Sequence, residues 1–202
     1  VTGVQTCALP ISARPVTVTV TAGQAKTYGE DDPASYAWTA SPGLLAGDAF
    51  TGSLVRATGD DAGTYAIGQG SLAAGSDYAI TFVPADFTIA PKPITVTATA
   101  GASKVYGASD PVFAYTTSPA LVGTDAFTGA LTREPGDNAG TYAIRRGTLS
   151  AGANYDVTYV AATFTITKKT LTITADAKAK TYGASRSEEH TSELQSRLHL
   201  VC

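Results

Sequence analysis

The feature that most constrains this chain is an internal repeat of about 77 residues. The nine residues Gly-Asp-Asp-Ala-Gly-Thr-Tyr-Ala-Ile at 59–67 return at 136–144 with a single change. The longer blocks around them also agree, with 12 of 19 positions identical between 15–33 and 93–111. This period is longer than that of solenoid repeats, and it predicts small domains that each close a core of their own.

The repeat divides the chain into two complete modules and the opening of a third. We predict a first module over residues 12–91, a second over 92–168 and a truncated third over 169–185. The terminal segments, residues 1–11 and 186–202, match none of these and look like translated sequencing-adapter sequence. We therefore leave both segments out of the fold prediction, like any artefact of sequence assembly.

Composition narrows the chemistry that the modules can carry. Both cysteines and both histidines lie in the two terminal segments, which argues against the usual zinc sites and histidine-paired nucleophiles in the modules. The net charge is −3, with no basic patch for a nucleic-acid backbone and no apolar run of about twenty residues. We expect neither an enzyme nor a nucleic-acid-binding protein, and no membrane insertion in this fragment.

Apolar residues alternate with a period of two, which is typical of half-buried strands. Valine alternates with threonine over residues 16–21, and similar alternation returns at 94–99 and 170–174. Turns rich in Gly, Pro, Asp and Asn separate the other strands of the first module, which we predict at 26–28, 35–39, 51–56, 64–67, 78–83 and 87–89. Residues 44–50 break the alternation, and we predict a single helical turn there.

These elements predict a mainly β fold of tandem small modules. Two architectures remain open, an immunoglobulin-like sandwich and a β-grasp with one short helix at residues 44–50. Only Ala90-Pro91-Lys92-Pro93 joins the last predicted strand of the first module to the first strand of the second. Because two prolines stiffen this link, we predict that the modules are arranged as an extended rod.

A tyrosine-glycine pair recurs in both modules. Tyr28-Gly29 and Tyr106-Gly107 each stand two residues after a lysine. One interpretation is a core or edge-strand tyrosine beside a glycine that takes positive φ. The other is an exposed aromatic ring that stacks on sugars.

The repeated turn carries clustered oxygen donors. Asp60 and Asp61, with Asp137 in the second copy, are candidate calcium ligands because calcium prefers carboxylate and carbonyl oxygens. Turn chemistry is the alternative, since aspartate bonds its own backbone in tight turns. Tyr65 and Tyr142 follow the turn and resemble the Asp-x-Gly-x-Tyr entry of immunoglobulin-like domains, where the tyrosine hydroxyl bonds nearby backbone.

The ordered motifs resemble the MBG-type repeat of bacterial surface proteins, in the form marked by a Tyr-Gly motif. The first copy carries Lys-Thr-Tyr-Gly at 26–29, Asp-Pro at 32–33, Ala-Phe-Thr-Gly at 49–52 and Gly-Thr-Tyr-Ala-Ile at 63–67, and the second copy carries their counterparts. This resemblance implies tandem arrays in large secreted adhesins, including filamentous-haemagglutinin-like proteins. It implies no catalytic residues.

We therefore predict a non-enzymatic structural or stalk fragment of a bacterial extracellular adhesin, located at the cell surface. No cofactor is expected apart from the calcium candidates. The alternative is that the modules themselves bind host glycans, mucin-like ligands or other surface proteins. Exposed loops at residues 34–58 and 68–76 are the places where such contacts would lie.

Overall fold

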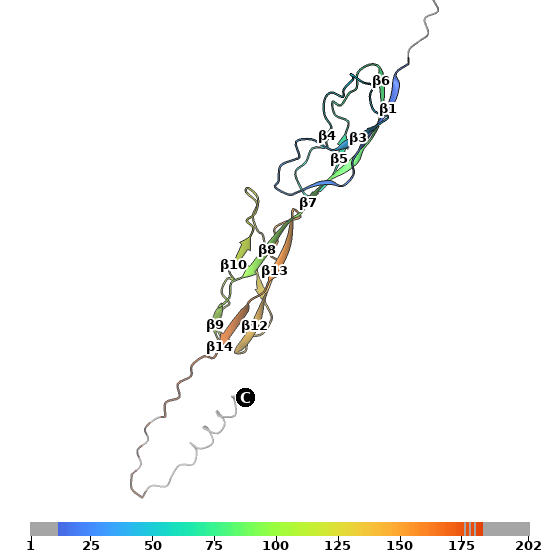
Figure 1. The fold of residues 1–202 in the computed structure, drawn as a ribbon. Coiled ribbons are helices and arrows are strands. Elements are labelled where there is room, and N and C mark those ends of the chain that lie inside the picture. The colour runs from blue at the N-terminus through green and yellow to red at the C-terminus, as the bar shows by residue number, and fades with distance from the viewer. Residues whose placement is uncertain (1–11, 176, 178, 180, 184–202) are drawn as a thin grey trace, which may run out of the picture. The chain divides into compact units, whose positions relative to one another are not determined.

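The computed structural model describes residues 12–175, 177, 179 and 181–183. The two segments predicted to be adapter-derived, 1–11 and 186–202, lie outside the described residues. The chain divides into two units on either side of Lys168 and Lys169, and both complete modules belong to the first (Figure 1).

The first module is a pair of small sheets. In the three-stranded sheet, β1 (Arg14–Val20) lies between β3 (Trp38–Ser41), which is antiparallel to it, and β6 (Tyr78–Val83), which is parallel. The second sheet has four strands in the order β2 (Gln24–Thr27), β7 (Ala85–Ala90), β5 (Gly63–Gly68), β4 (Val55–Arg56). Only β2 and β7 are parallel in this sheet.

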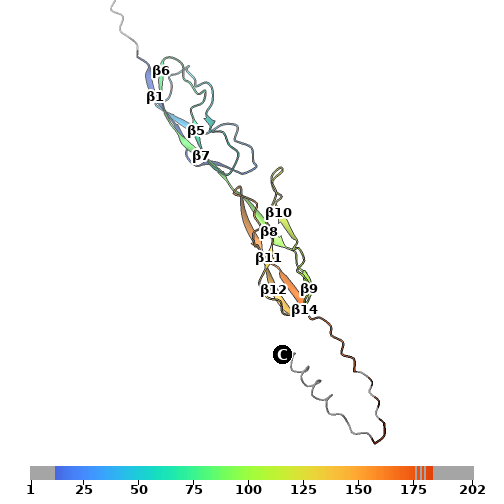
Figure 2. The same ribbon diagram turned by 180° about the vertical axis from the view of Figure 1, so that it is seen from behind.

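The second module repeats this topology strand for strand. Its three-stranded sheet has the order β10 (Tyr115–Ser118), β8 (Lys92–Ala98), β13 (Tyr155–Val160). Its four-stranded sheet has the order β11 (Thr132–Arg133), β12 (Gly140–Arg145), β14 (Thr163–Thr167), β9 (Ser103–Val105). Figure 2 shows β12 and β14 side by side, as their antiparallel pairing requires.

The predicted alternation decides which side chains enter each core. Val16 and Val18 are fully buried, whereas the threonines between and after them are at least partly exposed. The inner faces of the two sheets in the first module meet around Val18, Phe87 and Ile67. A separate apolar cluster, which includes Val96 and Phe164, fills the second module. Each copy therefore closes its own interior, as the repeat length predicts.

The helical turn predicted at residues 44–50 is wrong. The structure has a turn there, with a backbone bond from Asp48 N to the Leu45 carbonyl (3.1 Å), and the described residues contain no helix. Two features oppose a helix. Gly47 has a φ of +97°, and the amide of Leu45 donates to the hydroxyl of Tyr78 at 2.9 Å. The helix that the β-grasp alternative requires is absent from the described residues, and each module is a sandwich of two sheets. It follows that no helix in the described residues could cross a membrane.

Several predicted strands differ in length or position from those observed, and the strand expected at 35–39 lies instead at β3, residues 38–41. In place of the strand expected at 51–56, the structure has β4 and an isolated bridge between Thr51 and Ala73. The bridge and β4 are separate because Gly52, which follows Thr51, has a φ of +76°. The strand expected at 170–174 is absent, and both Leu171 and Ile173 are 77% exposed. In the complete modules this strand pairs with partners from later in the same module, and residues 169–183 include no such partner.

Candidate functional site

An arginine with a largely buried side chain organises the repeated turn of the first module. Arg56, in β4, is 9% exposed and bonds Asp32 through Nε (2.6 Å) and Nη2 (3.1 Å). Its Nη1 donates to the carbonyl oxygens of Ala57 (2.8 Å) and Gly59 (2.6 Å). Lys26 Nζ lies 2.7 Å from Asp32 Oδ1, the oxygen that also accepts from Arg56 Nη2. The guanidinium thus ties the turn to the loop that follows β2, and Lys26 ties the same loop to β2.

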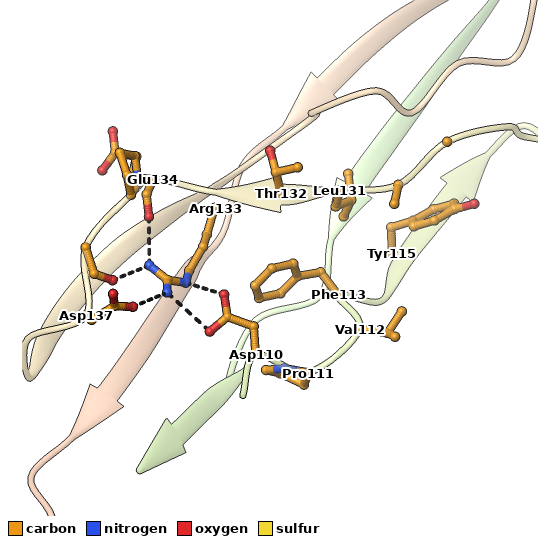
Figure 3. A pocket seen from close by; sticks show the side chains of 14 residues that line it. Asp110, Pro111, Val112, Phe113, Tyr115, Leu131, Thr132, Arg133, Glu134 and Asp137 are labelled. Atoms are coloured by element: carbon orange, nitrogen blue, oxygen red, sulfur yellow. Dashed lines mark hydrogen bonds and ion pairs between the residues drawn. The ribbon is translucent and has the colours of Figure 1, made fainter. Parts of the chain in front are cut away.

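The second module builds the same cluster around Arg133 (Figure 3). Arg133 Nε lies 2.7 Å from Asp110, and Lys104 Nζ lies 2.6 Å from the same carboxylate. Nη1 of Arg133 donates to the carbonyl oxygens of Glu134 (2.9 Å) and Gly136 (2.5 Å). The cluster forms one end of a groove whose other lining residues include Val112, Phe113 and Tyr115.

These ion pairs leave little free reactivity in the cluster. Hydrogen bonds from Arg56 and then from Lys26 hold the pKa of Asp32 well below its usual value. Arg133 and Lys104 lower the pKa of Asp110 in the same way. Such carboxylates stay ionised and paired near neutral pH, so they are poor proton acceptors. The arrangement fixes a loop and offers no poised general base.

Tyr65 and Tyr142 cover the arginines and close the turns. The Arg56 guanidinium carbon lies 5.1 Å from the ring centroid of Tyr65, and that of Arg133 lies 5.2 Å from Tyr142. The Tyr65 hydroxyl donates to the backbone oxygen of Asp61 at 2.8 Å, and the Tyr142 hydroxyl donates to that of Asn138 at the same distance. Both hydroxyls thus bond backbone four residues upstream.

The calcium candidates do not converge on one point. Asp60 lies 3.2 Å from Arg56 Nη2, and Asp137 lies 3.2 Å from Arg133 and 3.9 Å from Lys104. The Asp61 carboxylate accepts instead from the side-chain amide of Asn154. Among the described residues, no three histidine, cysteine or acidic side chains gather closely enough to hold a metal ion. The calcium assignment stays a prediction from the sequence alone.

Tyr28 reaches from the first module into the second. Its hydroxyl donates to Asp125 Oδ2 at 2.9 Å, and the hydroxyl of Tyr155 donates to the same oxygen at 2.6 Å. The rings of Tyr28 and Tyr155 meet edge to face with centroids 5.5 Å apart. Tyr155 also accepts from the amide of Val122 at 2.7 Å. The bond to Asp125 raises the pKa of Tyr28, and burial raises that of Tyr155.

Asn154 makes the second contact between the modules. Its Oδ1 accepts from the backbone amide of Ala62, and its Nδ2 donates to Asp61 Oδ1, both at 2.8 Å. Gly29 completes the joint, because a Cβ added there would lie 2.5 Å from Cγ2 of Val122. A side chain at residue 29 would therefore press on the second module.

The matching pair in the second module has no such neighbours in the described part of the chain. Tyr106 is 49% exposed, and a Cβ added at Gly107 would meet no atom within 4 Å. Both glycines have the same φ of +85°. Backbone conformation at the motif is thus the same in both copies, and the surroundings differ.

Several residues of this site lack a local signature in the sequence. Arg56 and Arg133 lie at the same place in both copies, and so do Asp48 and Asp125. Comparison of the charged positions that the two copies share would have found them. Asn154 gives no such signal, because the first copy has Asp77 at that place.

Comparison with known families gives one match. The family model described as MBG domain (YGX type) matches residues 16–88 and 94–165. No curated protein matches the chain. The two matched segments coincide with the two sandwiches.

Proposed function

Because this chain belongs to the MBG domain (YGX type) family, we propose that it is a non-enzymatic stalk segment of a bacterial extracellular adhesin. In this proposal the modules act as spacers at the cell surface. They hold another part of the same protein away from the cell, and they carry no reaction themselves.

The polar side chains that both copies share support the proposal, because they bond within a module or between modules. Arg56 and Lys26 both bond Asp32 inside the first module, and their counterparts bond Asp110 in the second. Tyr28 is used to join one module to the next. Residues that both copies retain thus serve folding and joining, which is what a spacer requires.

Solution scattering of the purified chain tests the spacer role. We expect a pair-distance distribution with a long tail, typical of an elongated particle. A symmetric distribution, typical of a globular particle, would contradict a stalk.

Cellular location needs a separate measurement. Antibodies raised against residues 12–168 should label intact bacteria that express the full-length gene. Labelling that appears only after the cells are permeabilised would argue against placement at the surface.

Binding of host glycans by the modules is a second candidate, favoured by the groove in Figure 3. Val112 at its edge is 96% exposed and Tyr115 is partly exposed, whereas Phe113 beside them is buried in the core. Apolar and aromatic surface of this kind packs against the faces of sugar rings. A glycan array probed with the chain and with a Val112→Ala, Tyr115→Ala variant tests it, and equal signals from both proteins would remove the candidate.

A further inference from the structure

We propose that the exposed tyrosine face at the end of the second module is a docking surface for a further copy of the same module, joined in the same chain. This end face consists of Tyr106, Asn138 and Ala139. The inference concerns how modules join, so it holds or fails whether or not the protein is a stalk at a cell surface.

The end face repeats a surface that is already occupied within this molecule. Tyr28, Asp61 and Ala62 form the equivalent face of the first module, and all three bond residues of the second module. The backbone holds the two tyrosines alike: Tyr28 N donates to the Ala90 carbonyl at 2.9 Å, and Tyr106 N donates to that of Thr167 at 2.8 Å. Tyr106 is therefore presented in the same way as Tyr28.

The surface that receives the tyrosine is built in the same way in both modules. We call Asp125, Tyr155 and Asn154 the start face of the second module. Its counterpart in the first module has Tyr78 donating to Asp48 Oδ2 at 2.5 Å, and the amide of Leu45 donating to Tyr78 at 2.9 Å. The occupied start face has the same pattern. Tyr155 donates to Asp125 at 2.6 Å, and the amide of Val122 donates to Tyr155 at 2.7 Å. A face that is ready before docking loses little conformational entropy on docking.

The end face and the start face differ between the two modules by a complementary exchange of Asp and Asn. At the existing joint, Asp61 of one module faces Asn154 of the next. The end face of the second module carries Asn138 in place of Asp61, and the start face of the first carries Asp77 in place of Asn154. Asn138 can donate to Asp77 as Asn154 donates to Asp61, whereas Asp61 opposite Asp77 would set two carboxylates together. The end face therefore accepts either start face.

Two insertions into the full chain test the proposal. One places a second copy of residues 14–91 between Lys168 and Lys169, and the other places a second copy of residues 92–168 there. Both keep the register of the existing joint, in which Pro91 precedes Lys92. The measurement is amide hydrogen exchange by NMR. The Ala62 amide of the original first module is the internal control, because it reports on the joint that already exists.

We expect exchange of the Ala139 amide to slow roughly tenfold in both insertions, because it gains the hydrogen bond that Ala62 already has. Unchanged exchange at Ala139 in both chains, with Ala62 still protected, would overturn the proposal. Asn138→Asp sharpens the test. The substitution should remove the protection when the inserted copy carries Asp77 and keep it when the copy carries Asn154. Equal effects in the two chains would overturn the pairing rule.

Discussion

The hydroxyl of Tyr28 donates a 2.9 Å hydrogen bond to Asp125, which lies 97 residues further along the chain. This bond crosses from one sandwich to the next. It gives the tyrosine of the Tyr-Gly motif a role in joining modules, beyond packing in its own.

Tyr28→Phe should loosen the joint between the modules. The ring keeps its contact with Tyr155, but the bond to Asp125 is lost. We expect faster hydrogen exchange at the Ala62 amide, which depends on the same joint. Tyr106→Phe is the matched control, and it should leave Ala62 unchanged. Equal effects of the two substitutions would show that Tyr28 acts only within its own module.

Gly29→Ala and Gly107→Ala form a second matched pair. Both glycines have a φ of +85°, so each substitution should destabilise its own module by about 1–2 kcal/mol, measured by urea unfolding. Only the Cβ at residue 29 presses on Val122. Exchange at Ala62 should therefore rise in Gly29→Ala alone, and a rise in both variants would contradict a contact at this glycine.

Arg56→Gln should destabilise the first module by about 2 kcal/mol, because Asp32 loses its main partner and two turn carbonyls lose their donor. The midpoint of urea unfolding, followed by far-ultraviolet circular dichroism, measures this loss. Arg145→Gln is the control, since Arg145 is 63% exposed and pairs only at the surface with Glu134. A loss in the control as large as that in Arg56→Gln would remove the special role of the turn arginine.

Acid should destabilise both modules through Asp32 and Asp110. Ion pairing lowers the pKa of each carboxyl below the value of 3.8 expected in the unfolded chain. Their contribution to stability is therefore complete above about pH 4 and is lost as the pH falls through the lowered pKa values. Urea unfolding at pH 6, 4, 3 and 2 should show this decline. Asp32→Asn should make the decline shallower, and an unaltered slope would contradict the assignment.

Phe164→Ala should unfold the second module before the first. Phe164 is fully buried in its own core cluster, and removal of its ring should cost about 3–5 kcal/mol. Hydrogen exchange of Ile67 in the first core should change far less than that of Ile144 in the second. Phe87→Ala should reverse the order. Simultaneous loss of both cores in either variant would contradict separate interiors.

The repeat and the two-residue period were enough to predict two β modules and the limits of β6, because alternation is a local property of the sequence. They could not decide between a sandwich and a β-grasp, because strand order leaves no such pattern. The loop at residues 44–50 could not be predicted in the same way, since Tyr78 holds it from 33 residues away. The joint between modules was equally hidden. Nothing near Tyr28 in the sequence says that its partner is Asp125, because pairing between distant side chains leaves no local pattern.

The parallel pairing of β1 with β6 bears on how a module responds to tension. The chain enters through β1 and leaves through β7, which follows β6 after a single residue. A pull on the two ends therefore draws β1 and β6 in opposite directions along their length. The six register pairs between them share that load and give way together, whereas a hairpin pulled open at its free end yields one pair at a time.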